Sequence, residues 1–272
     1  MSNCKKAVIS LSGGLDSTCL ALELLSQGKE VRAYSFYYGQ KHKVELQKVK
    51  RNIKFLQDKG LPITHQIINL EDVFSGNTSS LVASTGKDIP HGHYAAENMK
   101  STVVPLRNVI FSSIIYSKAI NWAVECGENV EITLGIHGGD HFIYRDCRPE
   151  SQEACRHAFA ISDENGGKVD YDAPFVNIDK AQVLGRGLKA MESMGFNKAD
   201  MRKVLKNTHT CYDPNEKGDS CGLCGSCEER IIAFYKNGIA DPVRYQKPWK
   251  EVLENALKSE SEFESIQDGE LK

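Results

Sequence analysis

The sequence predicts an α/β fold in which helices cover a parallel sheet. From Lys5 onward, short apolar runs typical of buried strands alternate with longer patterns typical of helices. Glycines stand where helical patterns stop, as Gly28 and Gly60 do. This alternation indicates strands joined by right-handed helical crossovers. The 272 residues suffice for one large domain with a small appended segment.

The N-terminal elements follow a strand–helix–strand order. The predicted strands are residues 5–11, 31–38 and 62–70, and the predicted helices are residues 16–27 and 41–59. Residues 72–100 break this rhythm, because Gly, Ser, Thr, Asn and His recur throughout them. A loop of this length inside a compact domain is usually a functional lid or a disordered stretch.

The C-terminal half returns to regular patterns. The predicted elements are a helix over 109–124, a strand over 130–136, an irregular stretch over 138–148, and helices over 149–161, 180–194 and 198–205. A cysteine-rich loop over 211–227 leads into a helix that ends at Lys236. We predict a last helix over 249–257, followed by a frayed, acidic and serine-rich tail beyond Lys258.

The composition is that of a soluble globular protein, with 40% hydrophobic and 26% charged residues. A net charge of −2 gives no overall attraction to nucleic acid or to an anionic membrane, so we expect neither as a partner. No apolar run approaches the ~20 residues that span a bilayer, and MSNCKKAVISL enters a strand pattern without a signal-peptide core. We therefore expect a cytoplasmic protein whose nine cysteines serve metal or catalytic roles rather than disulfides.

The first candidate site is the glycine turn Ser12–Ser17, which joins the first strand to the first helix. Glycines let the backbone approach an anion, and the N–H groups at a helix N-terminus hold phosphate oxygens. Ser12, Ser17 and Thr18 add hydroxyl donors, and Asp16 can position Mg²⁺ on the phosphates. The alternative is a tight turn in which Asp16 or Ser17 only caps the helix. The candidate nucleotide-binding residues are Leu11, Ser12, Gly13, Gly14, Leu15, Asp16, Ser17, Thr18, Cys19, Leu20 and Ala21.

The second candidate site is a cysteine cluster with the spacing C-x9-C-x2-C-x2-C. Its members are Cys211, Cys221, Cys224 and Cys227. Four thiolates at this spacing suit a tetrahedral structural Zn²⁺, which would hold the C-terminal segment on the core. An iron–sulfur cluster and free buried cysteines are the alternatives. The ferredoxin pattern continues with a further cysteine and a proline, whereas Glu228-Glu229-Arg230 follows here. The other cysteines lack this spacing, and most of them are predicted to be small core residues, with a nucleophile as the alternative for Cys147.

The glycine turn matches the SGGxDS signature of ATP pyrophosphatases. With the cysteine cluster, the chain resembles the 7-cyano-7-deazaguanine synthase family from about residue 5 to about residue 242. Six ordered blocks carry the resemblance: KAVISLSGGLDST, SFYYGQKH, HGHYAAENMKSTVVPLRN, GIHGGDHFIYRDCRPE, the residues around Asp179-Lys180-Ala181, and TCYDPNEKGDSCGLCGSCEER. The resemblance implies an adenine nucleotide α-hydrolase-like, Rossmann-like domain. We accordingly divide the chain into a nucleotide-binding domain (1–205), a zinc-binding segment (206–247) and a C-terminal helix with an acidic tail (248–272).

The resemblance also implies a reaction and its partners. The carboxylate of 7-carboxy-7-deazaguanine would attack the α-phosphate of ATP, and ammonia would displace AMP from the acyl-adenylate to give an amide. A second adenylation on the amide oxygen would lead to the nitrile, a precursor of queuosine. ATP, Mg²⁺ and Zn²⁺ are the implied cofactors, and a homodimer is the implied assembly.

Two anionic reactants need cations, and the overall charge does not supply them. The candidate catalytic residues are Asp16, Ser17, Arg107 and Lys180, and the candidate substrate-binding residues are Arg107, Asn108, Asp140, Asp146 and Arg148. Arg107 and Asn108 stand at the start of a predicted helix. Asp140, Asp146 and Arg148 follow the end of a predicted strand, where open α/β sheets bind ligands. Either aspartate can accept hydrogen bonds from the N–H edge of a deazaguanine. Each group has a structural alternative. Arg107 and Asn108 would be an exposed arginine and a helix cap, the two aspartates and Arg148 would form Asx turns and a surface ion pair, and Lys180 would be a solvated lysine. We expect His137 and His141 to pack within their loop rather than bind a metal.

Three positions depart from the common family pattern. Tyr37 stands where aspartate is frequent, which weakens any acid–base role there. Leu106 stands where asparagine or glycine is usual, and Arg145 stands where proline is usual.

Two other functions remain open. One is a related enzyme that stops at the amide or acts as a thiolase, and the other is a non-catalytic zinc module that binds nucleic acid.

Overall fold

The computed structural model describes residues 4–41, 44–92, 97–139 and 144–270. Its centre is a parallel sheet in the order β3-β2-β1-β4-β5. The strands are β1 (Lys6–Ser10), β2 (Glu30–Tyr37), β3 (Ile63–Asn69), β4 (Val130–Thr133) and β5 (Val169–Asp172). The chain winds from β1 outward to β3 and then crosses to β4 on the other side of β1. In sheets of this kind, the crevice at the carboxyl ends of the two strands where the winding reverses is the usual ligand site.

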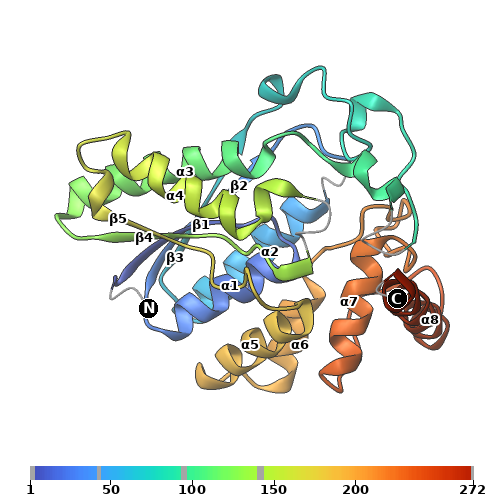
Figure 1. Ribbon diagram of the computed structural model, residues 1–272. Coiled ribbons are helices and arrows are strands. Elements are labelled where there is room, and N and C mark those ends of the chain that lie inside the picture. The colour runs from blue at the N-terminus through green and yellow to red at the C-terminus, as the bar shows by residue number, and fades with distance from the viewer. Residues whose placement is uncertain (1–3, 42–43, 93–96, 140–143, 271–272) are drawn as a thin grey trace.

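Helices cover both faces of the sheet (Figure 1). One face carries α1 (Leu15–Ser26), α2 (Val44–Asp58), α5 (Lys180–Ser193) and α6 (Lys198–Lys206), and the other carries α3 (Arg107–Cys126) and α4 (Pro149–Ile161). The two remaining helices, α7 (Gly225–Lys236) and α8 (Trp249–Glu270), lie together beyond one side of the sheet. Short 3-10 turns lie at Asp72–Phe74, Ala83–Thr85, Glu97–Thr102, Arg145–Cys147 and Gly166–Lys168.

The central strand β1 divides the core into two clusters. Ala7 and Ile9 pack with the α1 side of the sheet, and Val8 packs with the α3 side. All three side chains are fully buried. Successive side chains of a strand point to opposite faces, so a continuous apolar run is what a strand covered on both faces requires.

The predicted parallel α/β fold is confirmed, with two corrections to its elements. The sequence analysis missed β5, which is short, carries two aspartates and pairs only with β4 at the edge of the sheet. The predicted frayed tail beyond Lys258 was wrong, because α8 continues to Glu270. Lys258 pairs with Glu262 one turn further along α8, and Ser259 donates a hydrogen bond to Glu228 of α7. Such i,i+4 pairs support helix in a segment whose composition alone suggests disorder.

None of the helices in the described parts of the chain has the length and apolar character needed to cross a membrane.

His65 on β3 gives the fold a specific pH dependence. Its Nε2 lies 2.8 Å from Ser35 Oγ, and burial, reinforced by Lys50, lowers the pKa of His65 to about 4. The unfolded chain therefore binds a proton at His65 near pH 6.5, where the folded protein does not. We expect stability to fall between about pH 6.5 and pH 4, by at most ~1.4 kcal/mol per pH unit from this group.

Urea unfolding of the wild type and of His65→Gln at pH 7.5, 5.5 and 4.5 measures this contribution. As the pH falls, the free energy of unfolding of the wild type should decrease more than that of His65→Gln. The exposed His157 supplies the control variant, His157→Gln, which should keep the wild-type slope. A difference that stays constant over this range would disprove the assignment to His65.

Candidate functional site

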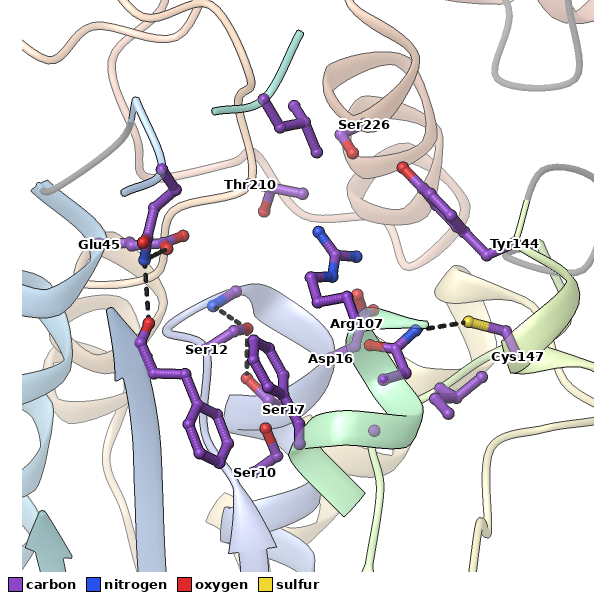
Figure 2. Close-up of a pocket in the computed structure, with 18 of the residues that line it drawn as sticks. Ser10, Ser12, Asp16, Ser17, Glu45, Arg107, Tyr144, Cys147, Thr210 and Ser226 are labelled. Atoms are coloured by element: carbon purple, nitrogen blue, oxygen red, sulfur yellow. Dashed lines mark hydrogen bonds between the residues drawn. The ribbon is translucent and has the colours of Figure 1, made fainter. Parts of the chain in front are cut away.

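A cavity of about 220 Å³ opens at the carboxyl ends of β1, β2 and β4. Ser10 at the end of β1 and Gly135 just after β4 both line it, so it lies where the winding of the sheet reverses. Side chains from α2, α3, α5 and the loop before α7 complete its walls (Figure 2). We call this cavity the pocket.

The glycine turn forms the floor of the pocket in a conformation that requires glycine. Gly13 has φ of 90°, and a Cβ there would lie 2.6 Å from Val49 Cγ2 and 3.0 Å from the Glu45 carbonyl oxygen. The Gly14 N–H donates to Ser12 Oγ at 3.1 Å, and Ser12 Oγ lies 3.1 Å from Ser17 Oγ. Close contact with α2 thus fixes the turn and aims the N-terminus of α1 at the pocket.

The candidate nucleotide-binding residues divide between the pocket and the core. Those that line the pocket are Ser12, Gly14, Asp16 and Ser17. Those buried in the core cluster behind it are Leu11, Leu15, Cys19, Leu20 and Ala21. Thr18 is buried, and its Oγ1 donates to the Gly14 carbonyl at 2.7 Å, so it holds the first turn of α1 in place.

Lys180 joins two carboxylates beside the glycine turn. Its Nζ lies 3.3 Å from Asp16 Oδ2 and 3.1 Å from Glu229 Oε2, and the lysine side chain is 7% exposed. Lys180 stands at the first position of α5, which a capping box formed by Asp179 and Gln182 fixes. The alternative of a solvated surface lysine is wrong, because burial with two anionic partners holds the side chain against the pocket.

His137 extends this ionic cluster. Its Nδ1 accepts the Gly139 N–H at 3.0 Å, so the neutral ring carries its proton on Nε2. That nitrogen lies 4.0 Å from Asp16 Oδ2 and 3.9 Å from Glu229 Oε2. Burial would raise the pKa of Asp16, but the charge of Lys180 and its hydrogen bond outweigh this effect, and the pKa of Asp16 is lowered overall. Asp16 is therefore held as a carboxylate at the helix N-terminus.

Arg107 enters the pocket from the first position of α3. Its Nη1 donates to Tyr38 Oη at 3.3 Å, and its guanidinium carbon lies 5.9 Å and 5.6 Å from the ring centroids of Tyr38 and Tyr144. Two tyrosines thus hold a cation over the pocket, where it can meet an anionic group. Asn108, the next residue, also lines the pocket and donates from Nδ2 to Cys147 Sγ at 3.1 Å.

Unlike Arg107, the other charged residues predicted to bind the substrate are not found among the described residues that line the pocket. Asp146 is not among the residues that line the pocket, and its Oδ2 accepts the Asn108 backbone N–H at 3.0 Å, at the start of α3. Arg148 precedes α4 and does not line the pocket either. Asp140 and His141 fall outside the described residues.

The four cysteines of the second motif come together as predicted. Cys211, Cys221, Cys224 and Cys227 are all buried, and their Sγ atoms lie within 4.8 Å of one another. Backbone N–H groups point at the sulfurs, as when Cys221 N donates to Cys211 Sγ at 3.2 Å and Cys224 N to Cys221 Sγ at 3.3 Å. This closed set of soft donors fits one tetrahedral metal ion.

The cysteine cluster also builds one wall of the pocket. Cys211 itself and its neighbours Thr210 and Tyr212 line the pocket, as does Ser226 on α7. Buried Arg230 ties this wall down, because its Nη1 donates to Thr210 Oγ1 at 2.9 Å. A metal that orders the cysteines therefore also orders part of the pocket.

Comparison of the sequence with known proteins identifies one family. Residues 6–238 match the family model of the queuosine biosynthesis protein QueC. The chain belongs to this family. A 7-cyano-7-deazaguanine synthase of Colwellia psychrerythraea is 40% identical over 241 residues, which are 89% of this chain and 99% of the relative. That of Methanoregula boonei is 38% identical over the same shares of both chains. The resemblance inferred from the sequence is confirmed.

A solved structure with similarity over most of the chain is the U34-tRNA thiolase NcsA of Methanococcus maripaludis with its [4Fe-4S] cluster. It is 14% identical, with a TM-score of 0.39, and the match covers 93% of this chain and 70% of that one.

Sequence reasoning missed several residues of the pocket in this QueC-family protein. Glu45, Tyr38 and Tyr144 line it, and Glu229 reaches Lys180 from α7. Tyr38 was the last residue of the predicted strand 31–38, and its place at a strand end, where open α/β sheets bind ligands, was an available signal. Glu229 gave no signal, because only the folding of α7 against α5 brings it to Asp16.

Leu106 carries backbone strain at the start of α3. Its φ is 54°, a left-handed conformation that costs a leucine about 1–2 kcal/mol. The side chain is 64% exposed, so little packing compensates. We expect Leu106→Asn to raise the free energy of unfolding by about 1 kcal/mol. Thermal unfolding measures this gain, and Val124→Asn on the same helix, also exposed, should give none. An unchanged or lower melting temperature for Leu106→Asn would contradict the strain.

Proposed function

We propose that this chain is a 7-cyano-7-deazaguanine synthase, an ATP-dependent ligase that converts 7-carboxy-7-deazaguanine and ammonia into the nitrile and releases AMP and pyrophosphate. The observation that supports this best is the pocket itself. It combines a helix N-terminus built for phosphate with two cations, the buried Lys180 and the half-buried Arg107, beside one cavity. Membership of the QueC family and the names of its relatives give the substrate.

In this proposal the glycine turn binds the phosphates of ATP. The N–H groups at the start of α1 donate to phosphate oxygens, and Ser12 and Ser17 add hydroxyl donors. Lys180 Nζ moves from Asp16 toward the departing pyrophosphate and offsets its negative charge. Phe36, Phe111 and Leu134 line the same pocket and offer an apolar surface for a heteroaromatic ring.

Asp16 would position Mg²⁺ on the phosphates. Its Oδ1 is buried and accepts no hydrogen bond from the described residues, and its lowered pKa keeps it charged. A hard cation prefers such an oxygen ligand. The metal would offset phosphate charge, and Asp16 would fix its place relative to Lys180.

Arg107 would hold the carboxylate of the deazaguanine. Its guanidinium faces the pocket between two tyrosine rings, so a carboxylate there gains a charge-assisted hydrogen bond in a partly dehydrated site. The enclosed walls would also exclude water from the acyl-adenylate, so that ammonia rather than water displaces AMP. The amide oxygen would then be adenylated in the same place.

Zn²⁺ is our proposal for the metal of the four-cysteine site, because all four positions are protein thiols and none is left open for chemistry. These thiols must stay reduced to bind a metal, which supports a cytoplasmic location. The division of the chain at residues 205 and 247 and the homodimer remain predictions.

A product assay tests the proposed function. The protein is incubated with ATP, Mg²⁺, ammonium and 7-carboxy-7-deazaguanine, and AMP, pyrophosphate, acid, amide and nitrile are measured by mass spectrometry. We expect AMP formation that depends on the carboxylate substrate and a nitrile product. An amide as the end product would support the shorter reaction, and no substrate-dependent AMP would reject the assignment.

A further inference from the structure

The proposed substrate presents two chemically different edges, and so far only the edge with the 7-carboxylate has been assigned a partner in the pocket, Arg107. Its 7-carboxylate is anionic, whereas the N1–H and the 2-amino group form a row of hydrogen-bond donors on the opposite side of the bicyclic ring. A buried donor row needs an acceptor, because an unpaired buried N–H costs about 1–3 kcal/mol. The pocket must therefore hold an acceptor away from Arg107.

Of the residues that the structure describes, Asp16 and Glu45 are the carboxylates that line the pocket. Asp16 lies at the glycine turn and is paired with Lys180, so it belongs to the phosphate end. Asp140 and Asp146 were the predicted acceptors. Asp146 accepts the Asn108 N–H at the start of α3 and does not line the pocket, and Asp140 lies outside the described residues. Among the described residues, Glu45 is thus the carboxylate that lines the pocket and is not paired with a lysine.

Gln40 holds Glu45 in place and occupies only one of its acceptor sites. Gln40 Nε2 donates to Glu45 Oε1 at 3.0 Å and to the Phe36 carbonyl at 3.0 Å, while Gln40 Oε1 accepts the Tyr38 N–H at 2.8 Å. All hydrogen-bonding atoms of the Gln40 amide are thereby engaged, so its orientation is fixed. Each carboxylate oxygen has two acceptor sites, and Gln40 uses one of the four on Glu45.

Charge around Glu45 also favours a ligand that donates hydrogen bonds. Burial raises the pKa of Glu45 to about 7, and the Gln40 hydrogen bond and the charge of Arg107 only partly offset it. Among the described residues, Gln40 is the one that donates a hydrogen bond to the Glu45 carboxylate. Two N–H groups from a base would stabilise its charged form.

Glu45 and Arg107 approach the pocket from helices on opposite faces of the sheet, α2 and α3 (Figure 2). A flat bicycle between them would turn its carboxylate to Arg107 and its donor edge to Glu45. Resting on the proposed function, we propose that Glu45 is the specificity residue that accepts hydrogen bonds from the N1–H and 2-amino groups of the deazaguanine, with Gln40 as its positioning residue.

The first test compares substrate dependence in Glu45→Gln and the wild type. Glutamine keeps the size of the side chain but replaces one acceptor with a donor that faces the N–H edge. We expect the KM for 7-carboxy-7-deazaguanine to rise about 100-fold, and that for ATP to change less than about twofold. Glu71, an exposed carboxylate that accepts from Tyr37 at the end of β2, supplies the matched control Glu71→Gln. This control should behave as the wild type does.

The second test uses an analogue of the substrate that lacks the 2-amino group. The wild type should prefer the full substrate by about 100-fold in kcat/KM, and Glu45→Gln should keep less than about fivefold of this preference. A purely structural defect would lower both rates together and leave the ratio unchanged. If Glu45→Gln does not fold, Glu45→Asp replaces it, and its shorter carboxylate should raise the KM about tenfold while retaining the preference.

The outcomes separate this inference from the proposed function. If the wild type forms no AMP from the carboxylate substrate, the proposed function fails. If the wild type does so and Glu45→Gln keeps both its KM and its preference for the 2-amino group, the role of Glu45 alone is rejected.

Discussion

Replacement of Lys180 by methionine is expected to lower turnover about a thousandfold. Lys180 is the cation that lies 3.3 Å from Asp16 and 3.1 Å from Glu229 at the edge of the phosphate site. Removal of one preorganised group that stabilises developing charge typically costs 10²–10³ in rate, about 2.7–4 kcal/mol. Here the loss of Lys180 also leaves the carboxylates of Asp16 and Glu229 facing each other where phosphates must bind. We therefore expect the loss of rate to lie at the upper end of this range.

The same replacement is expected to destabilise the fold by about 3–5 kcal/mol, because it removes the partner of buried charges. Lys180 is the strongest influence that lowers the pKa of Asp16, so in the variant burial dominates and that pKa rises. In the wild type, Asp16 contributes stability above its ordinary pKa and loses it as the pH falls. In the variant the sign reverses, and stability is greatest at low pH and falls as the pH rises through the raised pKa. The destabilisation should therefore be larger at pH 8 than at pH 5 in urea unfolding.

Two further variants separate chemistry from folding. Lys189→Met, an exposed lysine on α5, should change neither rate nor stability. Lys180→Met combined with Glu229→Gln removes one of the opposed charges and should recover much of the stability but none of the turnover. Near-normal turnover in Lys180→Met would remove Lys180 from the mechanism, and recovered turnover in the double variant would make its role structural.

Replacement of Cys224 by serine is expected to remove the bound metal and most of the stability of the C-terminal segment. Structural Zn²⁺ in small sites contributes apparent free energies of about 10–16 kcal/mol, and a whole domain is stable by only about 5–15 kcal/mol. Loss of one of the four ligands should therefore cost at least ~3 kcal/mol. Val252 and Ala256 of α8 pack on the cysteines, and Thr210 and Tyr212 next to Cys211 line the pocket. Turnover should fall together with melting temperature.

Metal analysis, thermal unfolding and hydrogen exchange measure these effects together. We expect one zinc per wild-type chain, little in Cys224→Ser, and faster exchange in α8 of the variant. Cys126→Ser, at a half-buried cysteine outside the cluster, should keep the wild-type metal content. Visible absorbance typical of iron–sulfur clusters would show that the metal is iron, and an unchanged melting temperature would contradict a structural metal.

The sequence was sufficient for those parts of the fold that depend on local pattern. The glycine turn and the cysteine spacing are local, so their residues and their context between strand and helix were predictable. The strand β1 was predictable because it is buried on both faces and therefore continuously apolar. β5 escaped because an edge strand with alternating aspartates looks like a loop, and the length of α8 depends on ion pairs and on contact with α7.

The walls of the pocket were harder to predict, because they depend on tertiary contacts. Glu229 meets Lys180 only when α7 packs on α5, and Glu45 faces the pocket only because Gly13 allows α2 to approach the turn. Asp146 shows the opposite case. Its place after a strand end predicted a substrate ligand, which stays a prediction, and in the structure its Oδ2 accepts a backbone N–H at the start of α3, where helix N–H groups have no partner within the helix.

The central claim is that this pocket transfers AMP to an oxygen of the substrate, and oxygen isotopes test it most directly. The protein is given ATP, Mg²⁺, ammonium and 7-carboxy-7-deazaguanine with ¹⁸O in both carboxylate oxygens, and AMP and the nitrile are analysed by mass spectrometry. Adenylation of the acid and then of the amide predicts two AMP molecules per nitrile, each with one ¹⁸O in its phosphate. AMP that carries no ¹⁸O, or label that appears in pyrophosphate or water, would contradict the account.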